Sequence, residues 1–173
     1  MFAFPYYGNP NVREVLLYPN SFDDSFQTST EVDHRNILGM VGNGFLKGEV
    51  ILSKPDLAHA FDGQRHANNV GIHEFIHLID KADDDTDGIP ENLMEHSCSL
   101  AWLKEIKRDI VRIEQGKDDI NPYALTNNAE FFVVVSEYFF DDPKKMQQKN
   151  LELYSYLSTI FHQNPDEYRH VAK

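Results

Sequence analysis

Residues 71–80 read GIHEFIHLID and contain the pattern His-Glu-x-x-His. Residues four apart on an α-helix lie on one face and one turn apart, so the side chains of His73 and His77 can converge on one ion. Each imidazole can then form a bond of about 2.0–2.1 Å to zinc. Glu74 follows the first histidine directly, which places it beside such an ion as a general base for an attacking water.

A structural alternative exists for this segment. It is a core helix with two hydrogen-bonded histidines and a solvated Glu74. The residues around the pair are mostly isoleucine, leucine and phenylalanine, which is typical of a buried helix. Imidazoles without a partner would be costly in such surroundings. We therefore predict a metal site with His73 and His77 as ligands.

A catalytic zinc ion also requires a third protein ligand and an open position. The metzincin pattern is excluded, because Asp80 and Asp83 stand where it requires glycine and histidine. Asp80 lies about 10.5 Å along the helix from His73, too far to bind the same ion together with both histidines. We expect Asp80 either to orient a ligand imidazole by a hydrogen bond or to face solvent.

The remaining candidates for the third ligand lie in a second apolar stretch, residues 127–137. Glu130 and Glu137 are two helical turns apart and therefore share a face. Acidic side chains in an apolar stretch need a partner. The spacing does not choose between the two, and a solvated stripe is the alternative.

The rest of the chain indicates a small sheet followed by helices. Strand-like runs occur at residues 12–18, 37–41 and 50–52, with glycines between them that suggest turns or a bulge. From about residue 70 the apolar period becomes helical. We expect helices over 94–113, ended by Gly116, over 128–140, and from Pro143 onward with Asp142 as N-cap. The prediction is one α+β domain over residues 1–173.

Composition limits the classes of function. The chain has 173 residues, a mass of 20.0 kDa and a formal net charge of −12. That charge speaks against binding to nucleic acid or to an anionic membrane. A single cysteine, Cys98, excludes an internal disulfide, and its place in a helical stretch predicts a buried thiol.

No apolar run approaches the roughly 18 residues of a membrane span. The first residues lack the basic and apolar regions of a signal peptide. We therefore expect a soluble cytoplasmic protein.

The acidic run at residues 83–88 matches the first half of an EF-hand calcium loop, with Asp at alternate positions and Gly88 at the sixth. The match then fails, because Pro90 stands at an aliphatic position and Met94 replaces the bidentate glutamate. We expect a solvated loop after the histidine helix.

Two blocks of sequence resemble a known family. Residues 71–90 read GIHEFIHLIDKADDDTDGIP and residues 121–140 read NPYALTNNAEFFVVVSEYFF. They are similar to the matching blocks of Mlc titration factor A and its relatives, zinc peptidases related to the catalytic domain of anthrax lethal factor. Residues 14–19 (EVLLYP) and 48–61 (GEVILSKPDLAHAF) resemble upstream segments of the family.

The resemblance implies a zincin-like fold with a gluzincin site that holds one Zn²⁺ ion. It implies that Glu130 is the third ligand beside His73 and His77, and that Glu74 is the general base. Tyr123 matches a tyrosine whose hydroxyl lies near the metal and can stabilise an oxyanion. Glu137 would then either orient a metal ligand without binding the ion itself or have a structural role.

The resemblance also implies two functions from different classes. The first is a zinc metallopeptidase that hydrolyses bonds in a peptide or protein substrate. The second is a non-catalytic binding module, because some family members bind a transcriptional repressor and so relieve repression. A purely structural zinc site is a third possibility.

Overall fold

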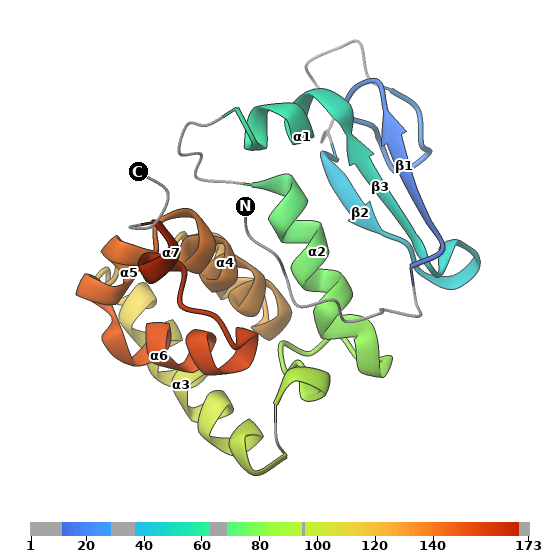
Figure 1. The fold of residues 1–173 in the computed structure, drawn as a ribbon. Helices are drawn as coiled ribbons and strands as arrows, with labels where there is room; N and C mark the ends of the chain where they lie inside the picture. The colour runs from blue at the N-terminus through green and yellow to red at the C-terminus, as the bar shows by residue number, and fades with distance from the viewer. Residues whose placement is uncertain (1–11, 29–36, 63–68, 95, 170–173) are drawn as a thin grey trace. The chain divides into compact units, whose positions relative to one another are not determined.

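The computed structural model describes residues 12–28, 37–62, 69–94 and 96–169 (Figure 1). The chain divides into two compact units, one within residues 9–78 and one within residues 79–173, and each is described by itself. The described residues form a three-stranded sheet and seven α-helices, so the expected mixture of a small sheet followed by helices is confirmed. The single domain over residues 1–173 stays a prediction.

The first unit is built on a sheet with the strand order β1-β3-β2. The strands are β1 (Glu14–Tyr18), β2 (Gly39–Val41) and β3 (Glu49–Ser53). The central strand β3 pairs parallel with β1 and antiparallel with β2, with Ile51 opposite Met40. Residues 50–52 of β3 are all buried, as expected for a strand covered on both faces.

The helix α2 (Val70–Asp80) carries the His-Glu-x-x-His motif and packs on this sheet. Val50 and Leu52 of β3 form a buried apolar cluster with Val70 and Leu78 of α2. Burying apolar side chains in this way supplies the main stabilisation of such a contact. The predicted histidine helix is therefore confirmed, and its apolar face covers the sheet.

The helix that follows the central strand was not predicted. Helix α1 (Lys54–Ala60) begins directly after β3, in a stretch where no helix was expected. Ser53 is its N-cap residue, Pro55 lies in its first turn, and the Ser53 hydroxyl bonds to the carboxylate of Asp56. A serine followed by proline and an acidic residue is a start signal for a helix, so the sequence contained the information.

The second unit is helical. Its α-helices are α3 (His96–Glu114), α4 (Asn128–Asp141), α5 (Pro143–Lys149), α6 (Leu151–Phe161) and α7 (Pro165–Arg169). Short 3₁₀ segments lie at η2 (Lys81–Asp83), η3 (Glu91–Leu93) and η4 (Pro122–Leu125), and η1 (Gly44–Leu46) belongs to the first unit.

Helix α4 is the centre of the second unit, because ten of its 14 residues are buried. The ring of Phe132 lies 6.0 Å from the ring of Trp102 on α3 and 5.9 Å from the ring of Phe161 on α6. Gly116, with a φ of +63°, follows the end of α3 as predicted.

Two expectations in this unit are wrong. The last predicted helix is divided at Asn150, whose side chain accepts the N–H of Leu153 at 3.2 Å and so starts α6 as a separate helix. Cys98 is exposed and not buried, because the large side chains that α3 buries begin one turn later, at Trp102. Within the described part of the chain, no helix has both the length and the apolar character to cross a membrane.

Two buried carboxyl groups lie one turn apart on α3. Glu105 is 3% exposed and Asp109 is fully buried, and both bond to Arg108. Burial, and then the neighbouring Asp109 carboxylate, raise the pKa of Glu105 to about 7. The folded protein therefore holds this proton more tightly than the unfolded chain does.

We predict that this proton makes the free energy of unfolding depend on pH. The contribution of Glu105 is fully present below pH 4.5, its ordinary pKa, and is lost as the pH rises to about 7. Glu105→Gln removes that part of the dependence, whereas Glu152→Gln, at an exposed partner of the same Arg108, leaves most of it in place, because Glu152 is a lesser cause of the raised pKa than burial. Urea unfolding between pH 4.5 and 8 measures both variants. An unchanged pH slope in Glu105→Gln would contradict the assignment.

Candidate metal centre

The start of α2 is fixed by Asn69, which the sequence analysis did not single out. Its side-chain oxygen accepts the N–H of Ile72 at 3.1 Å, and its side-chain nitrogen donates to the carbonyl of Ala60 at 3.2 Å. Asn69 is 3% exposed, so these bonds are shielded from water. They cap α2 and tie its first turn to the end of α1. An asparagine before an apolar helical run was the available signal.

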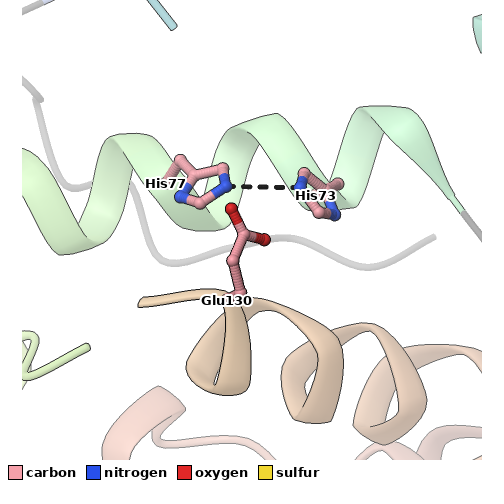
Figure 2. A group of neighbouring side chains, drawn as sticks. All are labelled: His73, His77 and Glu130. Atoms are coloured by element: carbon pink, nitrogen blue, oxygen red, sulfur yellow. Dashed lines mark hydrogen bonds between the residues drawn. The ribbon is translucent and has the colours of Figure 1, made fainter. Parts of the chain in front are cut away.

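His73 and His77 lie on one face of α2, one turn apart, with a ring nitrogen of each turned toward the other (Figure 2). Their Nε2 atoms are 3.2 Å apart. Two nitrogens bound to one tetrahedral zinc ion at about 2.0–2.1 Å are separated by roughly 3.3 Å. The observed separation of the two imidazoles therefore fits a shared zinc ion.

The side chain of Glu74 lies against the backbone of β2. It is 6% exposed, so the expectation of a solvated Glu74 in the structural alternative is wrong. A Cβ atom on Gly39 would lie 2.6 Å from Cγ and 2.8 Å from Oε1 of Glu74, which leaves room only for glycine. The glycines of this region predicted turns or a bulge, but Gly39 lies within β2 and makes space for this carboxylate.

Glu130 lies in the first turn of α4, from which its side chain extends in Figure 2. The side chain of Asn127 caps this turn by accepting the N–H of Glu130 at 2.9 Å. A carboxylate near a helix N-terminus interacts favourably with the helix dipole. By residue type, His73, His77 and Glu130 form a donor set that could hold a metal ion, and two histidines with one glutamate are a ligand set of catalytic zinc.

The other predicted site residues differ in exposure. Glu137, two turns after Glu130 on α4, is 6% exposed, so the solvated alternative is wrong for this residue. Tyr123 lies in η4 and is half-exposed. Its backbone N–H donates to the side chain of Asn121 at 3.0 Å, which fixes the turn that carries the phenol.

Asp80 is fully buried, so the alternative in which it faces solvent is wrong. Its Oδ2 atom accepts the backbone N–H of Gly88 at 3.1 Å. The sequence expectation that Asp80 orients an imidazole stays a prediction. Residues 84–87 between these two positions are exposed, as expected for a solvated loop.

Comparison with known proteins gives the family. The chain belongs to the glucose-regulated metallo-peptidase M90 family, which it matches over residues 1–162. Among curated relatives it is similar to Mlc titration factor A of Escherichia fergusonii, with 30% identity over 162 residues, 88% of this chain and 60% of that protein.

Two further relatives carry the same name. The protein from Serratia proteamaculans is 28% identical over 88% of this chain and 61% of its own length. The protein from Salmonella gallinarum is 29% identical over 90% of this chain and 61% of its own length. The family expected from the two sequence blocks is thus confirmed. The chain spans about three fifths of the length of these relatives.

We predict that Gly39→Ala lowers the free energy of unfolding by about 1–3 kcal/mol, because the new methyl group overlaps Glu74. Adding Glu74→Ala should recover part of this loss, since it removes two of the three overlapping atoms and leaves only Cγ2 of Val70. Gly44→Ala is the control for the coupling. Its φ of +59° makes alanine costly by itself, but a Cβ atom there meets nothing within 4 Å, so Glu74→Ala should not recover its loss. Urea unfolding of the single and double variants measures the coupling. Additive losses would show that the two side chains do not meet.

Proposed function

We propose that this chain is a zinc-dependent metallopeptidase that hydrolyses peptide bonds. The observation that supports this best is the 3.2 Å separation of the Nε2 atoms of His73 and His77, which suits two ligands of one zinc ion. Membership of a metallo-peptidase family supports the same reading. In this proposal Glu130 is the third ligand, and the fourth position is left to water or substrate.

A zinc ion at these ligands would supply a Lewis acid that polarises a carbonyl and lowers the pKa of water. His73 and His77 must bind it as neutral imidazoles through nitrogen lone pairs, and Glu130 as a carboxylate. All three side chains are half-buried, so each remains partly accessible to solvent. A purely structural site would instead be closed by four protein ligands.

Glu74 acts as the general base and then as the general acid. Its carboxylate accepts a proton from the attacking water and later donates that proton to the leaving amine. Burial against β2 supports this role, because contact with the Gly39 backbone restricts the carboxylate to few orientations. A general base must lie within hydrogen-bond distance of the water from which it accepts a proton, so a restricted carboxylate is favourable.

Tyr123 donates its phenolic hydrogen to the developing oxyanion of the substrate. Its half-exposed position in η4 supports access to a substrate. Glu137 supports the site from the buried side of α4. The zincin-like arrangement, the single domain over residues 1–173 and the cytoplasmic location belong to the same proposal, as does the absence of nucleic acid and membrane partners.

We predict that the wild-type chain purifies with about one zinc ion per chain and cleaves members of a mixed peptide library. Glu74→Gln should retain the zinc ion but lose at least about 100-fold in activity, because general acid–base catalysis contributes roughly that much or more. His73→Ala should lose the zinc ion and the activity together. Metal content by mass spectrometry and peptide cleavage with and without chelator measure these effects.

Substitutions of other glutamates show whether a loss of zinc or of cleavage is specific to the proposed site. Glu114→Gln, at an exposed residue at the end of α3, should change neither zinc content nor cleavage. Glu130→Ala should lower zinc content more than Glu137→Ala, because Glu137 supports the site without binding the ion. Full cleavage by Glu74→Gln would disprove the catalytic assignment, and unchanged zinc content in Glu130→Ala would disprove the third ligand.

A second candidate function rests on the name of the relatives. Titration of Mlc, as named for those proteins, suggests binding to a transcriptional repressor. We propose for this chain, as the alternative to catalysis, a binding module in which the zinc helix is only a scaffold. Loss of the metal should abolish peptide cleavage but should leave repressor binding by a scaffold in place.

The discriminating experiment measures repressor binding by the His73→Ala variant in a pull-down with the purified repressor. Binding that persists without zinc, in a chain that cleaves no peptide, would favour the binding module. Peptide cleavage that disappears with the metal would favour the enzyme.

A further inference from the structure

Gly88 is bonded through both of its backbone polar groups to buried side chains of two helices. Its N–H donates to Asp80 at the end of α2, at 3.1 Å. Its carbonyl accepts the indole N–H of Trp102 on α3, at 2.7 Å. Asp80 and Trp102 are both fully buried. Hydrogen bonds shielded from water in this way hold the backbone of Gly88 in one place.

Gly88 also lies directly against the N-terminus of α4. A Cβ atom on Gly88 would lie 2.3 Å from the carbonyl oxygen of Asn128 and 2.6 Å from its carbonyl carbon. The φ angle of Gly88 is +79°, which other residues rarely adopt. Only glycine therefore allows this approach, and it occurs two residues before Glu130.

The position of the Asp80 carboxylate is unfavourable for a negative charge. It lies at the C-terminus of α2, where the helix dipole disfavours a negative charge, and it is buried. The N–H of Gly88 offsets part of this cost. The bond therefore fixes Gly88 to the last residue of α2.

We infer that Asp80, Gly88 and Trp102 form a strut that positions Glu130 for the metal. This inference rests on the proposed function. The strut joins Asp80 and Trp102 to the first turn of α4, the helix that carries Glu130. Asp80, Gly88 and Trp102 are positioning residues, because each acts through the placement of a ligand. Mutation of residues that orient metal ligands from outside the coordination shell typically lowers metal affinity by 10–100-fold.

The test compares two glycine substitutions. Gly88→Ala should weaken zinc binding at least about tenfold, because the methyl group pushes the turn of Asn128 away. Gly116→Ala is the matched control, since Gly116 also has a positive φ but a Cβ atom there meets nothing within 4 Å. Zinc affinity is measured by competition with a chromogenic chelator. The absorption spectrum of the Co²⁺-substituted chain reports the ligand geometry, and it should change only in Gly88→Ala.

A milder variant tests the strut if Gly88→Ala does not fold. Trp102→Phe keeps an aromatic ring but removes the indole donor to Gly88, and it should weaken zinc binding about threefold or more. Ile113→Ala is its control, at a buried residue roughly 16 Å farther along α3. It destabilises the same helix without touching the strut, so zinc affinity should stay at the wild-type value.

The outcomes separate the strut from the proposed function. If the wild-type chain binds no zinc, the proposed function fails and this inference fails with it. If the wild-type chain binds zinc and Trp102→Phe binds it equally well with the same Co²⁺ spectrum, the strut alone is overturned. An equal loss of affinity in Ile113→Ala would also overturn it, because affinity would then follow the stability of the helix.

Discussion

The four-residue step between His73 and His77 on one unbroken helix is the constraint on which the proposed chemistry depends. It brings the two Nε2 atoms to 3.2 Å, a separation that flexible loops would not hold. Helix α2 must therefore be rigid, and the face opposite the two histidines must be buried. Its apolar side chains do so against β3, and Asn69 fixes where its first turn begins. The small sheet therefore serves chiefly as the support of one helix.

Each unit holds a helix with proposed metal ligands in a fixed position, and the two units do so by different packing. In the first, a central strand of apolar residues pairs on both sides and covers α2, so a short sheet is enough to hold it. In the second, α4 is surrounded by aromatic rings and buried on nearly every side. A helix packed in this way places its first turn reproducibly, which is what a ligand at Glu130 would need.

Buried carboxyl groups are frequent in this acidic chain, and they fall into two kinds. Glu105 and Asp109 share Arg108, and the raised pKa of Glu105 shows that its charge is only partly compensated. Glu74 and Asp80 instead lie against glycine backbone, at Gly39 and Gly88. Glycine is the residue that lets a main chain approach a carboxylate so closely. The second kind accompanies the proposed metal centre.

The sequence by itself determined most of the elements and the helical face that the proposed chemistry uses. The His-Glu-x-x-His spacing predicts the face that His73 and His77 share, and the apolar periods predict the strands, α3 and α4, because these signals depend on residues near each other in the chain. The family resemblance selected Glu130 over Glu137, which spacing alone could not do. Tertiary structure decided the rest. It buried Asp80, exposed Cys98, divided the last helix at Asn150, and placed Gly39 and Gly88 against carboxylates and backbone from distant parts of the chain. Such contacts depend on packing between elements, and a local sequence pattern contains no record of which elements will touch.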